Sequence, residues 1–154
     1  MANFDLRDVE FRSDGATDSL TSSMSPALFE DSLKREIATA VREERDLTIV
    51  ALALNSDAFE SLSTYQEALI AIAFALKHGL RAGDFFARIS EVGFWALLRT
   101  DEISAAAVID RLDLPRHESV KIHIVARKFS NYSEWIERID HLFFQGGLPP
   151  CTNI

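Results

Sequence analysis

The feature that most constrains the fold is a pair of apolar runs joined by a short polar turn. Residues 83–98 read GDFFARISEVGFWALL, and the letters SEVG separate the two apolar stretches. Apolar runs joined by a few residues that include a glycine are typical of a β-hairpin. We therefore expect an antiparallel pair of strands with a buried face, against which the remaining elements pack.

The sequence on both sides of this hairpin alternates between helical and extended patterns. An apolar, partly β-branched run at 47–54 predicts a buried central strand, and the alternating run 119–127 predicts a half-exposed strand. Helical spacing of apolar residues predicts helices at 25–44, 64–79, 102–112 and 132–144. This order gives an α+β fold with a ferredoxin-like βαββαβ core, a central, mostly antiparallel sheet and an extra N-terminal helix.

Length and composition indicate one compact domain. The chain has 154 residues, 47% of them hydrophobic, which is enough to build a single core. Residues 1–17 are polar and lack a sustained period, so we expect a flexible leader there. The domain is then expected to span residues 18–146, followed by a tail at 147–154.

Charge and the metal-binding residue types argue against several classes of function. The formal net charge of −8 repels polyanions, so a nucleic-acid partner is not expected. No apolar run has membrane-spanning length and no signal peptide is recognisable, so we expect a cytoplasmic protein without membrane contact. Cys151 is the single cysteine and the histidines are dispersed, which argues against a disulfide and a metal site. The histidines are His78, His117, His123 and His141.

Four stretches, in order and with consistent spacing, carry a resemblance to a known family. Residues 18–29, DSLTSSMSPALF, resemble the opening D-x-L-T-G-L-x-N-R-x-x-F of GGDEF domains. Residues 52–59, 87–98 and 133–144 resemble that family's metal-binding strand end, its signature hairpin and its closing helix. Over about residues 18–145, the chain is similar to diguanylate cyclases and their inactive relatives, which implies the same ferredoxin-like fold.

The resemblance also implies that the family's chemistry is lost. Diguanylate cyclases join two GTP molecules with the help of divalent metals, which need carboxylate ligands. The signature GGDEF is replaced by SEVGF, formed by Ser90, Glu91, Val92, Gly93 and Phe94. Its acidic pair corresponds to Val92 and Gly93, and the metal-binding aspartate of the preceding strand corresponds to Asn55. We therefore expect no catalytic residue, no Mg²⁺ and no other cofactor.

The family's product-binding motif, in contrast, is present. Arg81 to Asp84 read RAGD, which matches the R-x-x-D site at which relatives bind cyclic dimeric GMP (c-di-GMP). An arginine can bind a phosphate or a guanine edge bidentately, and an aspartate can accept from guanine N–H groups. Arg111 aligns, across a one-residue gap, with a supporting arginine of that site, and Arg88 aligns with the arginine before the signature. These four residues are the predicted ligand-binding set.

Two functions remain open from the sequence. In the first, the chain is a c-di-GMP receptor that uses Arg81 and Asp84 to control its docking on a protein partner or on a second copy of itself. In the second, it is a protein–protein interaction module that keeps the fold without binding a nucleotide. R-x-x-D also occurs as an ordinary solvated ion pair, which is the alternative interpretation of RAGD. A residual GTP-binding domain is disfavoured by Asn55 and Val92.

Overall fold

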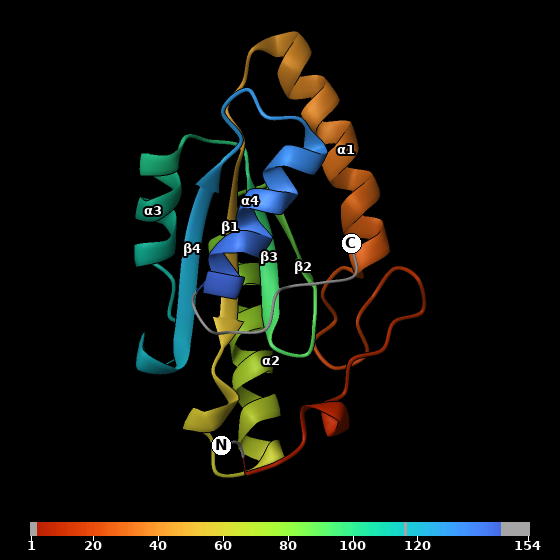
Figure 1. The fold of residues 1–154 in the computed structure, drawn as a ribbon, viewed down its shortest axis with the longest axis vertical. Helices are drawn as coiled ribbons and strands as arrows, with labels where there is room; N and C mark the ends of the chain where they lie inside the picture. The colour runs from red at the N-terminus through yellow and green to blue at the C-terminus, as the bar shows by residue number, and fades with distance from the viewer. Residues whose placement is uncertain (1–2, 116, 146–154) are drawn as a thin grey trace.

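The computed structural model describes residues 3–115 and 117–145. Within them, the main helices and strands follow one another in the order that the sequence predicts (Figure 1). The helices are α1 (Pro26–Glu43), α2 (Leu62–Gly79), α3 (Glu102–Asp110) and α4 (Tyr132–Gln145). The strands are β1 (Thr48–Leu54), β2 (Phe85–Arg88), β3 (Gly93–Leu98) and β4 (Val120–Ala126). Short 3-10 turns lie at η1 (Leu6–Asp8), η2 (Ser56–Ala58) and η3 (His117–Ser119).

The strands form one antiparallel sheet in the order β2-β3-β1-β4. β1 is central: its Ala51 lies opposite Trp95 of β3 on one side and His123 of β4 on the other. β2 and β3 form the hairpin that the sequence predicts. This strand order and the βαββαβ connectivity confirm the α+β, ferredoxin-like prediction.

Both faces of the sheet are covered by helices. Alternate residues of a strand point to opposite faces, so Ile49 and Ala51 of β1 pack with α1 and α4, whereas Val50 and Leu52 pack with α2 and α3. All seven residues of β1 are buried, as expected for a strand between two helical layers. The two faces of the sheet are therefore not available to a ligand or a partner.

Side-chain caps determine where two of the helices begin. The Ser25 hydroxyl accepts a hydrogen bond from the N–H of Leu28 at 3.2 Å, and Pro26 follows in the first turn. Helix α2 begins at Leu62, earlier than the predicted residue 64. The reason is a reciprocal capping box between Ser61 and Thr64, which places Thr64 inside the first turn.

The N-terminal segment 3–17 packs against the rest of the domain, whereas the sequence predicted a flexible leader. Val9 is only 5% exposed and lies in the core cluster on the α2–α3 face of the sheet. The Phe4 ring packs edge-on against Tyr65 at 5.1 Å between centroids, and the N–H of Glu10 donates to Gln66 Oε1 at 2.8 Å. Isolated apolar residues among charged ones have no period, so the sequence pattern does not reveal this packing. The expected tail, 147–154, lies outside the described residues.

None of the helices in the described ranges combines the length and the apolarity that a membrane span requires.

Candidate functional site

The segment Ser90–Phe94, which reads SEVGF, forms a well-packed turn between β2 and β3. Its Val92 side chain is 6% exposed, and the Val92 carbonyl accepts a hydrogen bond from the N–H of Leu54 at 2.8 Å. The Ser90 hydroxyl accepts from the N–H of Val92 at 3.2 Å, and Phe94 is fully buried. Thus, in place of an acidic pair, the turn has an apolar side chain that packs inward.

Tyr65 of α2 attaches this turn to the rest of the domain. Its hydroxyl donates to the Glu91 carbonyl at 3.2 Å, and burial raises the pKa of Tyr65, so the group remains a protonated donor. The rings of Phe4 and Phe59 pack edge-on against Tyr65. Phe4 belongs to the N-terminal segment, so that segment closes over the same end of α2 to which the turn is tied.

Asn55, which the sequence resemblance aligned with a metal-binding aspartate, uses its side chain for local structure. Its Oδ1 accepts from the N–H of Asp57 at 3.0 Å and begins the turn η2, while its own N–H donates to the Ser119 carbonyl at 2.8 Å. In the described part of the chain, no group of three or more His, Cys, Asp or Glu side chains is placed to hold a metal ion.

The prediction that Arg88 binds a ligand is wrong, because its side chain is not accessible to a ligand. The side chain is fully buried and its Nη1 lies 3.2 and 3.3 Å from the two carboxylate oxygens of Asp18. The same nitrogen donates to the Glu10 carbonyl, and the guanidinium lies 5.1 Å from the ring centroid of Phe11. Arg88 therefore joins the hairpin to the segment 10–18 as a structural residue.

The RAGD motif forms a tight turn that leads into β2. The N–H of Asp84 donates to the Arg81 carbonyl at 3.1 Å, and Gly83 has a φ of 94°, a conformation that favours glycine. Arg81 is exposed, and its side chain makes no hydrogen bond or ion pair with any described residue. The side chains of Arg81 and Asp84 thus do not pair with each other.

Asp84 is half-buried and is oriented by a residue that sequence reasoning missed. Its Oδ1 accepts a hydrogen bond from the N–H of Arg99 at 3.0 Å, while its Oδ2 has no partner among the described residues. The Arg99 guanidinium in turn forms an ion pair with Glu36 of α1, and this hydrogen bonding raises the pKa of Arg99. The partner of Asp84 lies fifteen positions along the chain, beyond the reach of a local motif.

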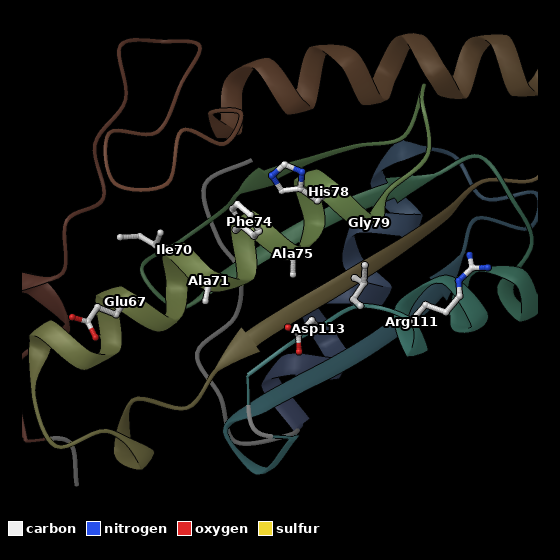
Figure 2. A pocket seen from close by; sticks show the side chains of 10 residues that line it. Glu67, Ile70, Ala71, Phe74, Ala75, His78, Gly79, Arg111 and Asp113 are labelled. Atoms are coloured by element: carbon white, nitrogen blue, oxygen red, sulfur yellow. The ribbon is translucent and has the colours of Figure 1, made fainter.

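Arg111 ends α3 and lies at a groove between α3 and α2 (Figure 2). The α2 terminus approaches this segment closely: a Cβ added to Gly79 would lie 2.0 Å from Leu112 Cδ2. Arg81 follows Gly79 by two positions. The structure therefore brings the surroundings of Arg111 and of the RAGD turn together, whereas Arg88 and Asn55 belong to other parts of the domain.

Comparison with known proteins supports the fold through structure alone. No protein-family model matches the chain, and no curated protein is similar to it in sequence. The GGDEF domain of DgcB from Caulobacter crescentus, solved in complex with c-di-GMP, matches with a TM-score of 0.70 and 20% identity, covering 90% of this chain and 95% of that one. The FimX GGDEF domain from Pseudomonas aeruginosa matches with a TM-score of 0.65 and 17% identity, over 80% and 88% of the two chains.

A further match is the diguanylate cyclase SiaD from Pseudomonas aeruginosa, solved in complex with its activator SiaC. Its TM-score is 0.67 at 20% identity, over 85% of this chain and 57% of SiaD. At these identities the likeness concerns the backbone arrangement. The chain has the fold of GGDEF domains, as the motifs in its sequence implied.

Proposed function

We propose that this chain, which has the fold of GGDEF domains, is a catalytically inactive member of that family and a receptor for c-di-GMP. The observation that carries the proposal is that polar side-chain atoms of the RAGD turn have no partner among the described residues. Arg81 is exposed without an ion-pair partner among the described residues, next to a half-buried aspartate that keeps one oxygen unbonded. Two solved GGDEF domains with this fold are complexes with c-di-GMP, which supports this choice of ligand.

The chemistry of the turn suits such a ligand. The planar guanidinium of Arg81 matches a phosphate or the O6 and N7 edge of guanine, with two parallel hydrogen bonds in either case. Asp84 Oδ2 is an acceptor for the ring N–H and amino groups of the base. The hydrogen bond from the Arg99 N–H holds Asp84 in place, so less conformational freedom is lost when the ligand binds.

The absence of catalysis follows from the groups that have replaced the metal ligands. Asn55 is neutral and its Oδ1 is already bonded, and Val92 presents a buried hydrocarbon. Without carboxylates, the charge of two triphosphates and of the transition state is not neutralised. We expect that the protein, incubated with GTP and Mg²⁺, forms no c-di-GMP detectable by chromatography, under conditions in which an active diguanylate cyclase does. Formation of the product would contradict this part of the proposal.

The receptor function is tested by titration calorimetry of c-di-GMP into the full chain. We expect a Kd in the micromolar range or below, about −8 kcal/mol or better. Arg81→Ala should weaken binding at least tenfold, because it removes the charge-assisted hydrogen bonds. Arg12→Ala is a matched control: Arg12 is also exposed but belongs to the N-terminal segment, which packs at the other end of the hairpin. Absence of binding by the parent protein would refute the proposal.

The second candidate, a nucleotide-independent interaction module, is favoured by a different observation. Several large apolar side chains are exposed, among them Phe129 at 100%, Phe74 at 65% and Val41 at 59%. SiaD, which shares the fold, was solved with a protein activator. In the receptor proposal such surfaces contact a protein partner or a second copy once the ligand is bound. In the module proposal, Arg81→Ala leaves that contact unchanged.

A further inference from the structure

Helix α2 carries an exposed apolar side that no described part of the chain covers. Its residues 68–76 read ALIAIAFAL, nine positions without a charge or a hydrogen-bonding side chain. A helix that is apolar all round is normally buried all round. One side of α2 packs against the sheet, whereas on the other side Ile70 is 45% exposed and Phe74 is 65% exposed. Neighbouring large apolar side chains left in water indicate a contact surface.

This surface, which we call the α2 stripe, follows the helical period and has opposite charges at its two ends. Glu67, Ile70, Phe74 and His78 follow one another along α2 at spacings of three and four residues (Figure 2). Glu67 and Lys77, the neighbour of His78, are exposed, and neither side chain forms a hydrogen bond or an ion pair with a described residue. At about 1.5 Å per residue, these two charges are about 15 Å apart along the helix axis.

The centre of the α2 stripe combines a projecting ring with a hollow. Phe74 projects from the helix, and the centroids of the Phe74 and His78 rings are 4.2 Å apart. Beside Phe74, the small side chains of Ala71 and Ala75 line a groove of ≈ 550 Å³ (Figure 2). Helices pack against each other by inserting a side chain of one into a hollow of the other, and the α2 stripe offers both parts of such a contact.

We infer that the α2 stripe binds a second copy of this chain, with the two α2 helices antiparallel about a twofold axis that passes between Ala71 and Phe74. A twofold contact has to be complementary to itself. The α2 stripe meets this condition, because reversing its direction places Glu67 of each copy opposite Lys77 of the other. The Phe74 ring of each copy then enters the groove of the other. The charge complementarity favours a second copy over an unrelated protein, and the contact needs neither c-di-GMP nor the RAGD turn.

The test is sedimentation equilibrium of the full chain without nucleotide, over a range of protein concentrations. We expect a monomer–dimer equilibrium with a Kd in the micromolar range. Phe74→Glu should weaken the dimer about tenfold or more, because it places a carboxylate in the centre of an apolar contact. Val41→Glu is the matched control: Val41 is 59% exposed, and α1 packs on the opposite face of the sheet. This control variant should dimerise like the parent protein.

An exchange of charges tests the antiparallel orientation. Glu67→Lys and Lys77→Glu should each weaken the dimer, because each variant places like charges opposite one another at both ends of the contact. The double variant should dimerise about as tightly as the parent protein, since it restores both pairs with the signs reversed. Circular dichroism checks that each variant is folded.

The inference is overturned if the parent protein is monomeric at every concentration, if Phe74→Glu dimerises like the parent protein, or if the double variant stays as weak as the single ones. A dimer that forms only after c-di-GMP is added also overturns it, because the contact then belongs to the receptor function. Arg81→Ala separates the two proposals: without nucleotide it should dimerise like the parent protein, although its affinity for c-di-GMP is expected to fall.

Discussion

Replacing Asp18 by alanine is expected to destabilise the domain by about 3–5 kcal/mol, the cost of leaving one member of a buried ion pair without its partner. The Arg88 side chain is fully buried, 3.2 Å from the Asp18 carboxylate. Asp18 also accepts hydrogen bonds from the N–H and hydroxyl of Thr21, so the variant loosens the turn before α1 as well. Stability is measured by urea unfolding, followed through the fluorescence of the buried Trp95 and Trp135.

Two further variants test whether the stability lost in Asp18→Ala comes from the buried ion pair. Asp5→Ala removes the carboxylate of an exposed ion pair with Arg7 and should leave the unfolding midpoint nearly unchanged. The double variant Asp18→Leu, Arg88→Met removes both buried charges and should recover part of the loss, because an apolar pair of similar volume needs no electrostatic compensation. A change of less than about 1 kcal/mol in Asp18→Ala would contradict the structural role assigned to the pair.

Deleting residues 1–11 is expected to lower the free energy of unfolding by about 3 kcal/mol or more. The deletion removes the buried Val9 side chain, whose burial stabilises the fold by about 1.5–3 kcal/mol. It also removes the Glu10 carbonyl that accepts a hydrogen bond from Arg88, and a hydrogen bond to a charged donor contributes about 1.5–3 kcal/mol. It also removes the ring of Phe4 from Tyr65, which holds the signature turn. The same urea unfolding experiment measures the loss, and the folded fraction is checked by circular dichroism.

Two matched valine variants test whether the stability lost on truncation comes from the buried packing of the N-terminal segment. Val9→Ala removes two buried methyl groups and should cost about 1 kcal/mol or more. Val41→Ala makes the same change at a side chain that is 59% exposed and should have little effect. Unchanged stability of both the truncated chain and Val9→Ala would support the flexible leader expected from the sequence.

The candidate site was only partly predictable. The spacing of R-x-x-D predicts Arg81 and Asp84 as ligand-binding residues, and the resemblance predicts Arg111; these features are local in the sequence, and the binding role of the three residues stays a prediction. The role of Arg88 was misjudged: an arginine next to a turn looks exposed, and its partner Asp18 is seventy positions away. Arg99 carried no recognisable signal, since it stands fifteen positions from Asp84 in the sequence.

The sequence by itself determined the order of the elements, their approximate limits and the presence of uncharged residues at positions 55 and 92. These properties depend on periodicity, on caps such as Ser25 and on the chemical identity of Asn55 and Val92, all of which are local. The tertiary structure alone decided that the N-terminal segment packs into the domain, that Arg88 is buried, and that Arg111 lies beside the end of α2. Each of these depends on contacts between distant segments, which form only when the chain has closed its sheet and core.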